Sequence, residues 1–152
     1  MITISITLFN EIRNHAIREY PHECCGAILG ELNKAKKIVT NVILLDNHWE
    51  SISGEGKTRR FRITPKDYQY VELRAKDEGV TLLGFYHSHP DHPPRPSETD
   101  LLYAWPFFSY PILSIKGGQF DEVKSFELDG RRFREESIEI YDKHRISGLD
   151  KY

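Results

Sequence analysis

The stretch Gly84-Phe-Tyr-His-Ser-His-Pro-Asp-His-Pro-Pro-Arg-Pro-Ser-Glu-Thr-Asp100 contains two histidines one residue apart, a proline-rich turn and then Ser-x-x-Asp. Residues 80–89 are mostly apolar, β-branched or aromatic, which predicts a buried central strand. His87 and His89 would then point to the same face of the sheet, because side chains alternate along a strand. A chain reversal at the prolines would bring Asp100 back to the two imidazoles.

Two neutral imidazoles and one carboxylate form a donor set that suits a catalytic zinc with one position left for water. Each half of the pattern is weak evidence by itself, since His-x-His occurs by chance and Ser97-x-x-Asp100 is also an ordinary helix start with Ser97 as N-cap. Both halves fall within one stretch from His87 to Asp100, joined by a turn-forming segment. This spacing allows a metal site formed by His87, His89 and Asp100, which the family resemblance described below favours, while His92 is a candidate spare ligand or a residue of the rim.

Length and composition are those of a soluble globular protein. The chain has 152 residues, of which 39% are hydrophobic and 29% charged, and its formal net charge is −2. We expect one domain over residues 1–146 and a frayed tail over residues 147–152. No basic face for nucleic acid is expected, and no apolar run approaches the ~20 residues needed to span a bilayer. The start of the chain does not read as a secretion signal, so we expect a cytoplasmic protein.

Periodicity and turn residues predict alternating strands and helices followed by hairpins, which agrees with an α/β fold but does not fix the strand order. Thr64 and Pro65 fit the N-cap and first position of a helix that Gly79 ends. The expected strands cover residues 2–7, 24–32, 37–45, 60–64, 80–89, 110–116, 123–128 and 132–135, and the expected helices cover 8–20, 65–78 and 97–105.

The histidine and Ser-x-x-Asp motifs together resemble the signature of the JAMM/MPN+ zinc metallopeptidases. The resemblance runs from about residue 4 to residue 128 and points to the compact bacterial branch with CysO-cysteine peptidase-like members. That family also carries a glutamate on an early strand, and Tyr20-Pro-His-Glu-Cys-Cys-Gly26 looks like the segment that supplies it. This points to Glu23, which would otherwise be interpreted as a solvent-facing acid at a strand entrance. The implied fold is the JAMM/MPN core, a mixed curved β-sheet flanked by helices with a cytidine-deaminase-like architecture.

The resemblance also implies a role for each site residue. One Zn²⁺ would be held by His87, His89 and Asp100 and would make water more acidic. Glu23 would take the proton of that water and pass it to the departing amine, and Ser97 would donate a hydrogen bond to the oxyanion.

The implied substrate is a ubiquitin-like sulfur-carrier protein, ThiS- or MoaD-like, with a Gly-Gly tail. The enzyme would hydrolyse the amide after the terminal glycine and release cysteine or a short peptide in sulfur metabolism. The loop 46–60 either clamps this carrier, with Trp49 as an apolar anchor and Arg59 or Arg60 meeting acidic groups, or is an unrelated loop. Two other functions stay open: an isopeptidase that removes such a modifier from lysines, and a non-catalytic MPN scaffold.

Overall fold

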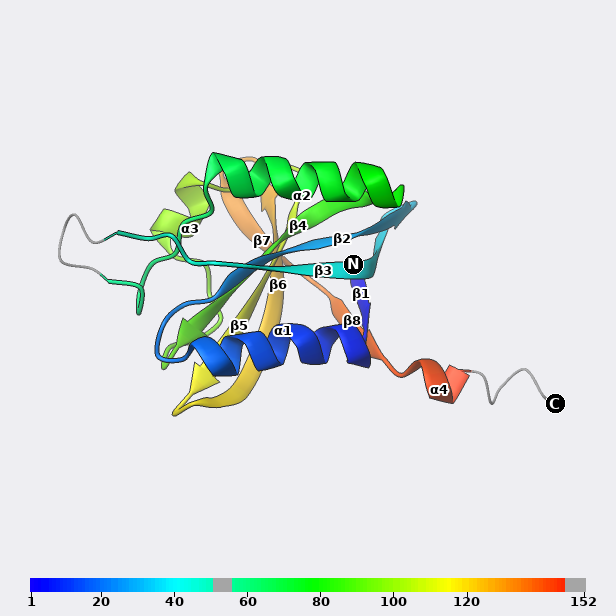
Figure 1. The fold of residues 1–152 in the computed structure, drawn as a ribbon. Helices are drawn as coiled ribbons and strands as arrows, with labels where there is room; N and C mark the ends of the chain where they lie inside the picture. The colour runs from blue at the N-terminus through cyan, green and yellow to red at the C-terminus, as the bar shows by residue number, and fades with distance from the viewer. Residues whose placement is uncertain (51–55, 147–152) are drawn as a thin grey trace.

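The computed structural model describes residues 1–50 and 56–146. Eight strands of this part form one sheet in the order β7-β6-β5-β4-β2-β3-β1-β8 (Figure 1). The strands are β1 (Ile2–Ser5), β2 (Cys25–Asn33), β3 (Lys36–Leu45), β4 (Thr81–Pro90), β5 (Ser109–Lys116), β6 (Gln119–Asp129), β7 (Arg132–Glu136) and β8 (Ile138–Tyr141). The helices are α1 (Ile6–Glu19), α2 (Pro65–Glu78), α3 (Glu98–Leu102) and α4 (Lys143–Ile146).

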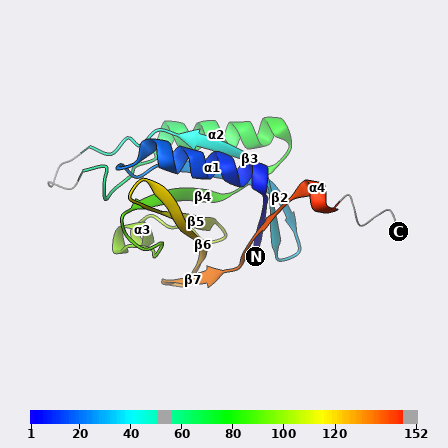
Figure 2. The same cartoon turned by 90° about the horizontal axis from the view of Figure 1, so that it is seen from below.

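The sheet is mixed and strongly curved. β4 pairs with β5 in parallel and β1 pairs in parallel with both β3 and β8, whereas the other pairs are antiparallel. β7 and β8 lie at opposite ends of the strand order although only Ser137 separates them in the sequence, and the Ile2 N–H donates to the Ser137 carbonyl at 3.0 Å. The sheet therefore bends round until its two edges are nearly joined by a single segment of chain (Figure 2). This confirms the predicted mixed curved sheet flanked by helices.

α1 and α2 cover opposite faces of the sheet (Figure 1). On the α1 face, Phe9 and Ile12 pack in one buried cluster with Tyr86. On the α2 face, Val71 packs in a second cluster with Phe85. Neighbouring residues of β4 thus contribute to two separate cores. No described helix is long and apolar enough to cross a membrane.

α2 has the ends that the sequence predicts. The Thr64 hydroxyl accepts from the Asp67 N–H at 3.2 Å, and the Asp67 carboxylate accepts from the Thr64 N–H at 3.1 Å. Together these bonds form a capping box, with Pro65 at the first position. Gly79 ends the helix with a left-handed φ of 67°, a conformation that costs glycine little.

Several boundaries differ from the prediction. The first strand ends at Ser5 because the Ser5 hydroxyl caps α1, accepting from the Leu8 N–H at 3.3 Å, so the helix begins at Ile6. α3 is shorter than expected and ends at Leu102. The predicted strand over residues 60–64 is wrong, since these residues form irregular chain. The sequence reading did not predict β8 or α4, and the expected frayed tail over residues 147–152 lies outside the described residues.

Candidate metal centre

Strand β4 carries the two histidines at the centre of the sheet, between β2 and β5. The His87 and His89 Nε2 atoms lie 3.1 Å apart. The Asp100 Oδ2 atom lies 3.3 Å from the His87 Nε2 and 3.6 Å from the His89 Nε2. The two imidazoles are buried and the Asp100 side chain is only 11% exposed. The structure thus brings together the three predicted metal ligands.

The first turn of α3 holds the Asp100 carboxylate in place. Asp100 Oδ2 accepts from the Ser97 N–H at 2.8 Å, and the Ser97 hydroxyl accepts from the Asp100 N–H at 3.0 Å. This is a second capping box, and it confirms Ser97 as the N-cap. Because a hydroxyl group both accepts and donates, capping uses an acceptor lone pair of Ser97 and leaves its hydrogen as a donor.

Each histidine ring is oriented by a further contact. His89 Nδ1 lies 2.8 Å from the Pro93 carbonyl, which can only accept, so in the neutral ring Nδ1 carries the hydrogen and Nε2 carries the lone pair. His87 stacks on the Phe61 ring with the centroids 4.6 Å apart. The His89 contact is the usual arrangement around a metal-binding imidazole, and the stack on Phe61 limits the orientation of the His87 ring.

Glu23 lies two residues before the first residue of β2 and is itself buried, with its Oε1 4.0 Å from the His89 Nε2. Its backbone is fixed on both sides. The Glu23 N–H donates to the Lys57 carbonyl at 2.7 Å, and the Glu23 carbonyl accepts from the Asn47 side-chain amide at 3.0 Å. Glu23 is therefore held against the site and is not a solvent-facing acid.

Asn47 is a residue that the sequence reading missed. Its side chain donates to the Arg60 carbonyl at 2.9 Å and accepts from the Arg62 N–H at 3.1 Å. These bonds satisfy backbone groups that a strand would pair with a neighbouring strand, which is why residues 60–64 form irregular chain. An asparagine after a strand offers donors and acceptors of this kind, but the sequence does not say which backbone groups they reach.

The two acids of the site differ in protonation. Burial alone would raise the pKa of Asp100, but the neighbouring His87, the close His89 ring and the hydrogen bond from the Ser97 N–H hold it well below the ordinary value. Burial raises the pKa of Glu23 to about 8, and nearby Asp100 adds to this, whereas His89, Arg60 and Arg59 oppose it. Asp100 is thus charged as a metal ligand must be, whereas Glu23 can hold or release a proton near neutral pH.

The three donors fit a tetrahedral cation. With metal–ligand distances of about 2.0–2.2 Å, ligand atoms in a tetrahedral zinc site lie about 3.3–3.6 Å apart. The three distances measured here, 3.1, 3.3 and 3.6 Å, come close to this spacing. A nitrogen- and oxygen-donor set with three protein ligands is the type found in catalytic zinc centres.

His92 forms a second group of donors with Glu23 and His89, whose ligand atoms all lie within 4.8 Å of one another. The His92 ring stacks on His89 with the centroids 4.1 Å apart, and its Nδ1 lies 2.7 Å from the Pro90 carbonyl. His92 is half-buried and borders the site, which agrees with the predicted rim position and leaves it a candidate spare ligand.

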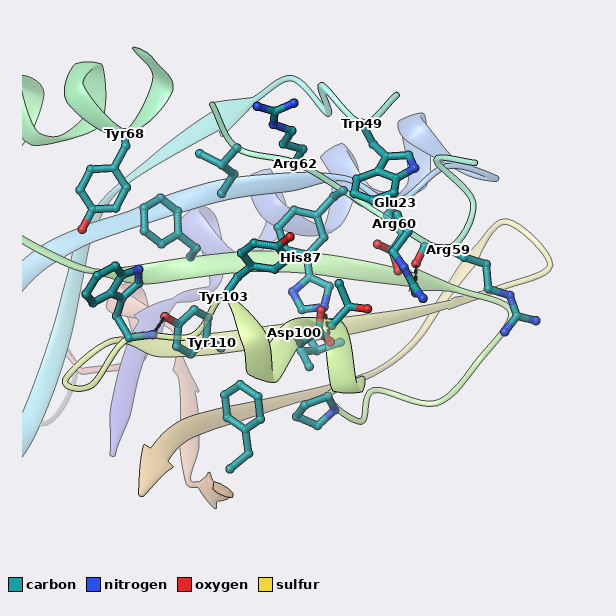
Figure 3. Close-up of a pocket in the computed structure, with 18 of the residues that line it drawn as sticks. Glu23, Trp49, Arg59, Arg60, Arg62, Tyr68, His87, Asp100, Tyr103 and Tyr110 are labelled. Atoms are coloured by element: carbon teal, nitrogen blue, oxygen red, sulfur yellow. Dashed lines mark hydrogen bonds and ion pairs between the residues drawn. The ribbon is translucent and has the colours of Figure 1, made fainter. Parts of the chain in front are cut away.

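A cavity of about 380 Å³ opens beside the three donors. Glu23, His87 and Asp100 line it, and so do the three residues predicted to bind substrate, Trp49, Arg59 and Arg60. Figure 3 shows Trp49, Arg59 and Arg60 grouped around Glu23, whereas Tyr68 and Tyr110 lie beyond His87 on the other side. The cavity thus has a cationic end at Glu23 and an aromatic end.

Comparison with known proteins places this chain among relatives of similar length. A desampylase of Haloferax volcanii is 28% identical over 135 residues, which cover 88% of this chain and 89% of the relative. A CysO-cysteine peptidase of Mycobacterium bovis is 22% identical over 145 residues, covering 95% and 94%. The structure of a JAB1/MPN domain protein of Archaeoglobus fulgidus superposes with a TM-score of 0.60 at 20% identity, covering 93% of this chain and 98% of the other, and shows the same fold.

A family model described as prokaryotic homologs of the JAB domain matches residues 5–129. The match includes both arms of the site, Glu23 ahead of β2 and the segment from His87 to Asp100. This chain belongs to the prokaryotic JAB family.

Proposed function

We propose that this protein is a zinc-dependent peptidase that hydrolyses the amide bond after the C-terminal glycine of a ubiquitin-like sulfur-carrier protein, ThiS- or MoaD-like, and releases cysteine or a short peptide. The observation that carries the proposal is the buried triangle of His87, His89 and Asp100 with the Glu23 carboxyl 4.0 Å from His89 at one end of a cavity. The CysO-cysteine peptidase and desampylase relatives support the class of reaction and substrate.

His87, His89 and Asp100 would hold the cation. When bound there, zinc would supply a Lewis acid that activates water and polarises the scissile carbonyl. The buried site keeps both effects strong because little solvent screens them.

Glu23 would move the proton. Its pKa of about 8 allows the carboxylate form to take a proton from the attacking water and the acid form to give it to the departing amine. With the cation bound, this pKa would fall below its metal-free value, which would favour the carboxylate at the start of the reaction.

Ser97 would stabilise the oxyanion. Its hydroxyl accepts the Asp100 N–H and keeps a hydrogen to donate; Ser97 itself does not line the cavity, so a substrate oxygen would have to reach it past Asp100. Losing one such donor typically costs about 100- to 1,000-fold in rate.

Trp49, Arg59 and Arg60 would bind the substrate at the Glu23 end of the cavity. The departing amine must lie near Glu23 to receive its proton, so these residues would contact the leaving group or the protein beside it. The guanidinium groups of Arg59 and Arg60 suit a carboxylate, such as that of a released cysteine.

The test combines metal analysis with cleavage of defined substrates. Purified protein should bind about one zinc per chain, and Asp100→Asn should weaken its retention. Carriers with a C-terminal Gly-Gly-Cys extension should lose cysteine, detected by mass spectrometry, and chelation should abolish the reaction until zinc is restored. A zinc-loaded protein that leaves every carrier conjugate intact would contradict the proposal and favour a non-catalytic scaffold.

An isopeptidase acting on lysine-linked modifiers is the second candidate, favoured by the similarity to a desampylase over 88% of this chain. Both activities use the same centre and differ in the leaving group. Incubating the enzyme with equal concentrations of a linear carrier–cysteine and a lysine-linked conjugate of the same carrier separates them. Faster release of cysteine supports the first proposal, and faster release of the lysine-linked protein supports the second.

A further inference from the structure

The far end of the cavity is an aromatic chamber formed by Tyr68, Phe85, Trp105, Tyr110 and Phe133. Four of these rings form two contacting pairs: the Tyr68 and Phe85 centroids lie 5.6 Å apart, and those of Tyr110 and Phe133 lie 5.8 Å apart. The Trp105 N–H donates to the Tyr110 hydroxyl at 2.7 Å, which ties the loop after α3 to β5. The metal-site chemistry uses none of these residues.

The two glycines of a Gly-Gly tail would not fill this chamber. Two glycines have no side chains, so they can pass the buried donors closely but cannot fill a space walled by five rings. Binding cavities walled by aromatic residues generally bury apolar groups. The chamber therefore points to a side chain elsewhere in the substrate.

The position of Glu23 determines whether the acyl side or the leaving-group side of the scissile bond extends toward the chamber. The group that protonates the departing amine must lie on the leaving-group side of the scissile bond. Glu23 lies with Arg59 and Arg60 at one end, and Tyr68 and Tyr110 lie at the other with His87 between them (Figure 3). The acyl side of the substrate, which carries the glycine tail, must then extend toward the chamber.

Strand geometry fixes which residue of the tail arrives there. Phe85 and His87 lie on the same face of β4, two residues apart, which is roughly 7 Å along a strand. An extended tail covers the same distance in two residues. If the carbonyl of the terminal glycine lies at the metal donors, the residue two positions earlier lies level with Phe85.

We propose that the aromatic chamber binds one large apolar side chain, that of the residue two positions before the terminal glycine of the substrate, and thereby selects the tail sequence. This rests on the proposed function, since it assumes cleavage after that glycine. Burial of a leucine or phenylalanine side chain should raise kcat/KM by roughly 10- to 100-fold over glycine at this position.

Synthetic peptides ending in Ala-Ala-Xaa-Gly-Gly-Cys test the selection, with Xaa as Leu, Phe, Ala, Gly or Asp and cysteine release measured by mass spectrometry. We expect Leu and Phe to be cleaved fastest and Gly and Asp slowest. The same series with the variable residue moved one position earlier should show a much weaker preference. Equal cleavage of all members of the first series would overturn the proposal.

Two aromatic residues of one loop provide matched variants. Trp105 lines the chamber and is 64% exposed, whereas Phe107 is 90% exposed and does not line the cavity. Trp105→Ala should reduce the Leu-to-Gly ratio several-fold while the Gly peptide is still cleaved, and Phe107→Ala should leave the ratio unchanged. An unchanged ratio in Trp105→Ala, or an equal drop in both variants, would contradict the chamber as the selecting site.

A binding measurement separates this inference from the proposed function. The chain has two tryptophans, so Trp105 is the remaining one in a Trp49→Phe variant. The product peptide Ala-Ala-Leu-Gly-Gly should change the fluorescence of Trp105 at roughly tenfold lower peptide concentration than Ala-Ala-Gly-Gly-Gly does. This expectation holds whether or not the protein hydrolyses any substrate. Equal binding of the two peptides refutes the chamber proposal, whereas selective binding without any hydrolysis of peptides or carriers refutes the proposed function alone.

Discussion

The buried polar side chains on the two faces of strand β4 differ in how they are paired. On the α1 face, the Tyr86 hydroxyl lies 2.8 Å from His15 Nδ1, and the Ser88 hydroxyl accepts from the Cys24 N–H at 2.8 Å. On the other face, the Nε2 atoms of His87 and His89 and the Asp100 carboxylate converge on one another. The first face satisfies its polar groups within the protein, and the second concentrates donors that suit a cation.

The same difference appears in the pKa values. Burial lowers the pKa of His15 and raises that of Tyr86, so both stay neutral and form an uncharged pair inside the core. On the metal-site face, the pKa of Glu23 is raised and that of Asp100 is lowered, so two carboxyls in one site prefer different protonation states. Neutral pairing serves stability, whereas separated pKa values are typical of catalytic sites.

The largest effect in this comparison is expected for Glu23→Gln, which keeps the shape of the side chain but removes the carboxyl group that accepts and donates a proton. We expect kcat to fall by roughly 100- to 10,000-fold, because general base catalysis contributes about that much. Zinc content should stay near wild type, since Glu23 is not one of the three proposed ligands. Glu19→Gln, on a partly exposed acid of α1, is the control and should keep full activity. A Glu23→Gln enzyme with near-normal turnover would show that another group moves the proton.

Ser97→Ala separates catalysis from helix capping. We expect kcat to drop by about 100- to 1,000-fold from the lost oxyanion donor, and stability to drop by about 1 kcal/mol from the lost cap. Thr64→Ala removes the same kind of cap from α2 and should cost similar stability with little change in kcat. Equal kinetic losses in the two variants, compared by steady-state kinetics and urea unfolding, would mean that Ser97 acts only as a cap.

Metal-free protein should lose stability as the pH rises from about 5 to 8. In this range the folded state keeps a proton on Glu23, whose pKa is raised from 4.5 to about 8, while the unfolded chain has released it. The loss should be on the order of 3 kcal/mol, and Glu23→Gln should remove most of it. Asp100 acts in the opposite direction, since its lowered pKa adds stability that is lost only in acid. Urea unfolding of wild type and Glu23→Gln at pH 5.5 and 8.5, with a chelator present, measures this difference. An equal change of unfolding free energy with pH in the two proteins would contradict the prediction.

Tyr86→Phe tests the α1 face and should give the smallest effect. Removing the hydroxyl leaves His15 buried without this partner, which should cost about 1–3 kcal/mol of unfolding free energy. Because Tyr86 points away from the metal site, kcat/KM and zinc content should stay within about twofold of wild type. Tyr70→Phe, on a half-exposed tyrosine of α2, is the control for stability. A large loss of activity in Tyr86→Phe would show that the two faces are coupled.

Short-range features were predictable because they depend on neighbouring residues. The caps at Thr64 and Ser97 and the central strand ending in the histidines each follow from a few adjacent side chains. Failures occurred where distant residues decided the outcome. Residues 60–64 have strand-like composition, but the Arg60 carbonyl and the Arg62 N–H hydrogen-bond with the Asn47 side chain instead of a neighbouring strand. β8 was missed because its short segment is ordered by pairing with β1, at the other end of the chain.

The sequence alone determined the donor types, their local spacing and the elements that carry them, since these depend on side-chain chemistry and on strand and helix periodicity. Only the tertiary structure decided that Glu23 lies 4.0 Å from His89 in a buried site and that five aromatic residues line one end of the cavity. The physical reason is that burial and through-space distance result from pairing β2 against β4 and packing α2 and α3 beside them. A pKa raised to about 8 is a property of that packing, which no single stretch of sequence contains.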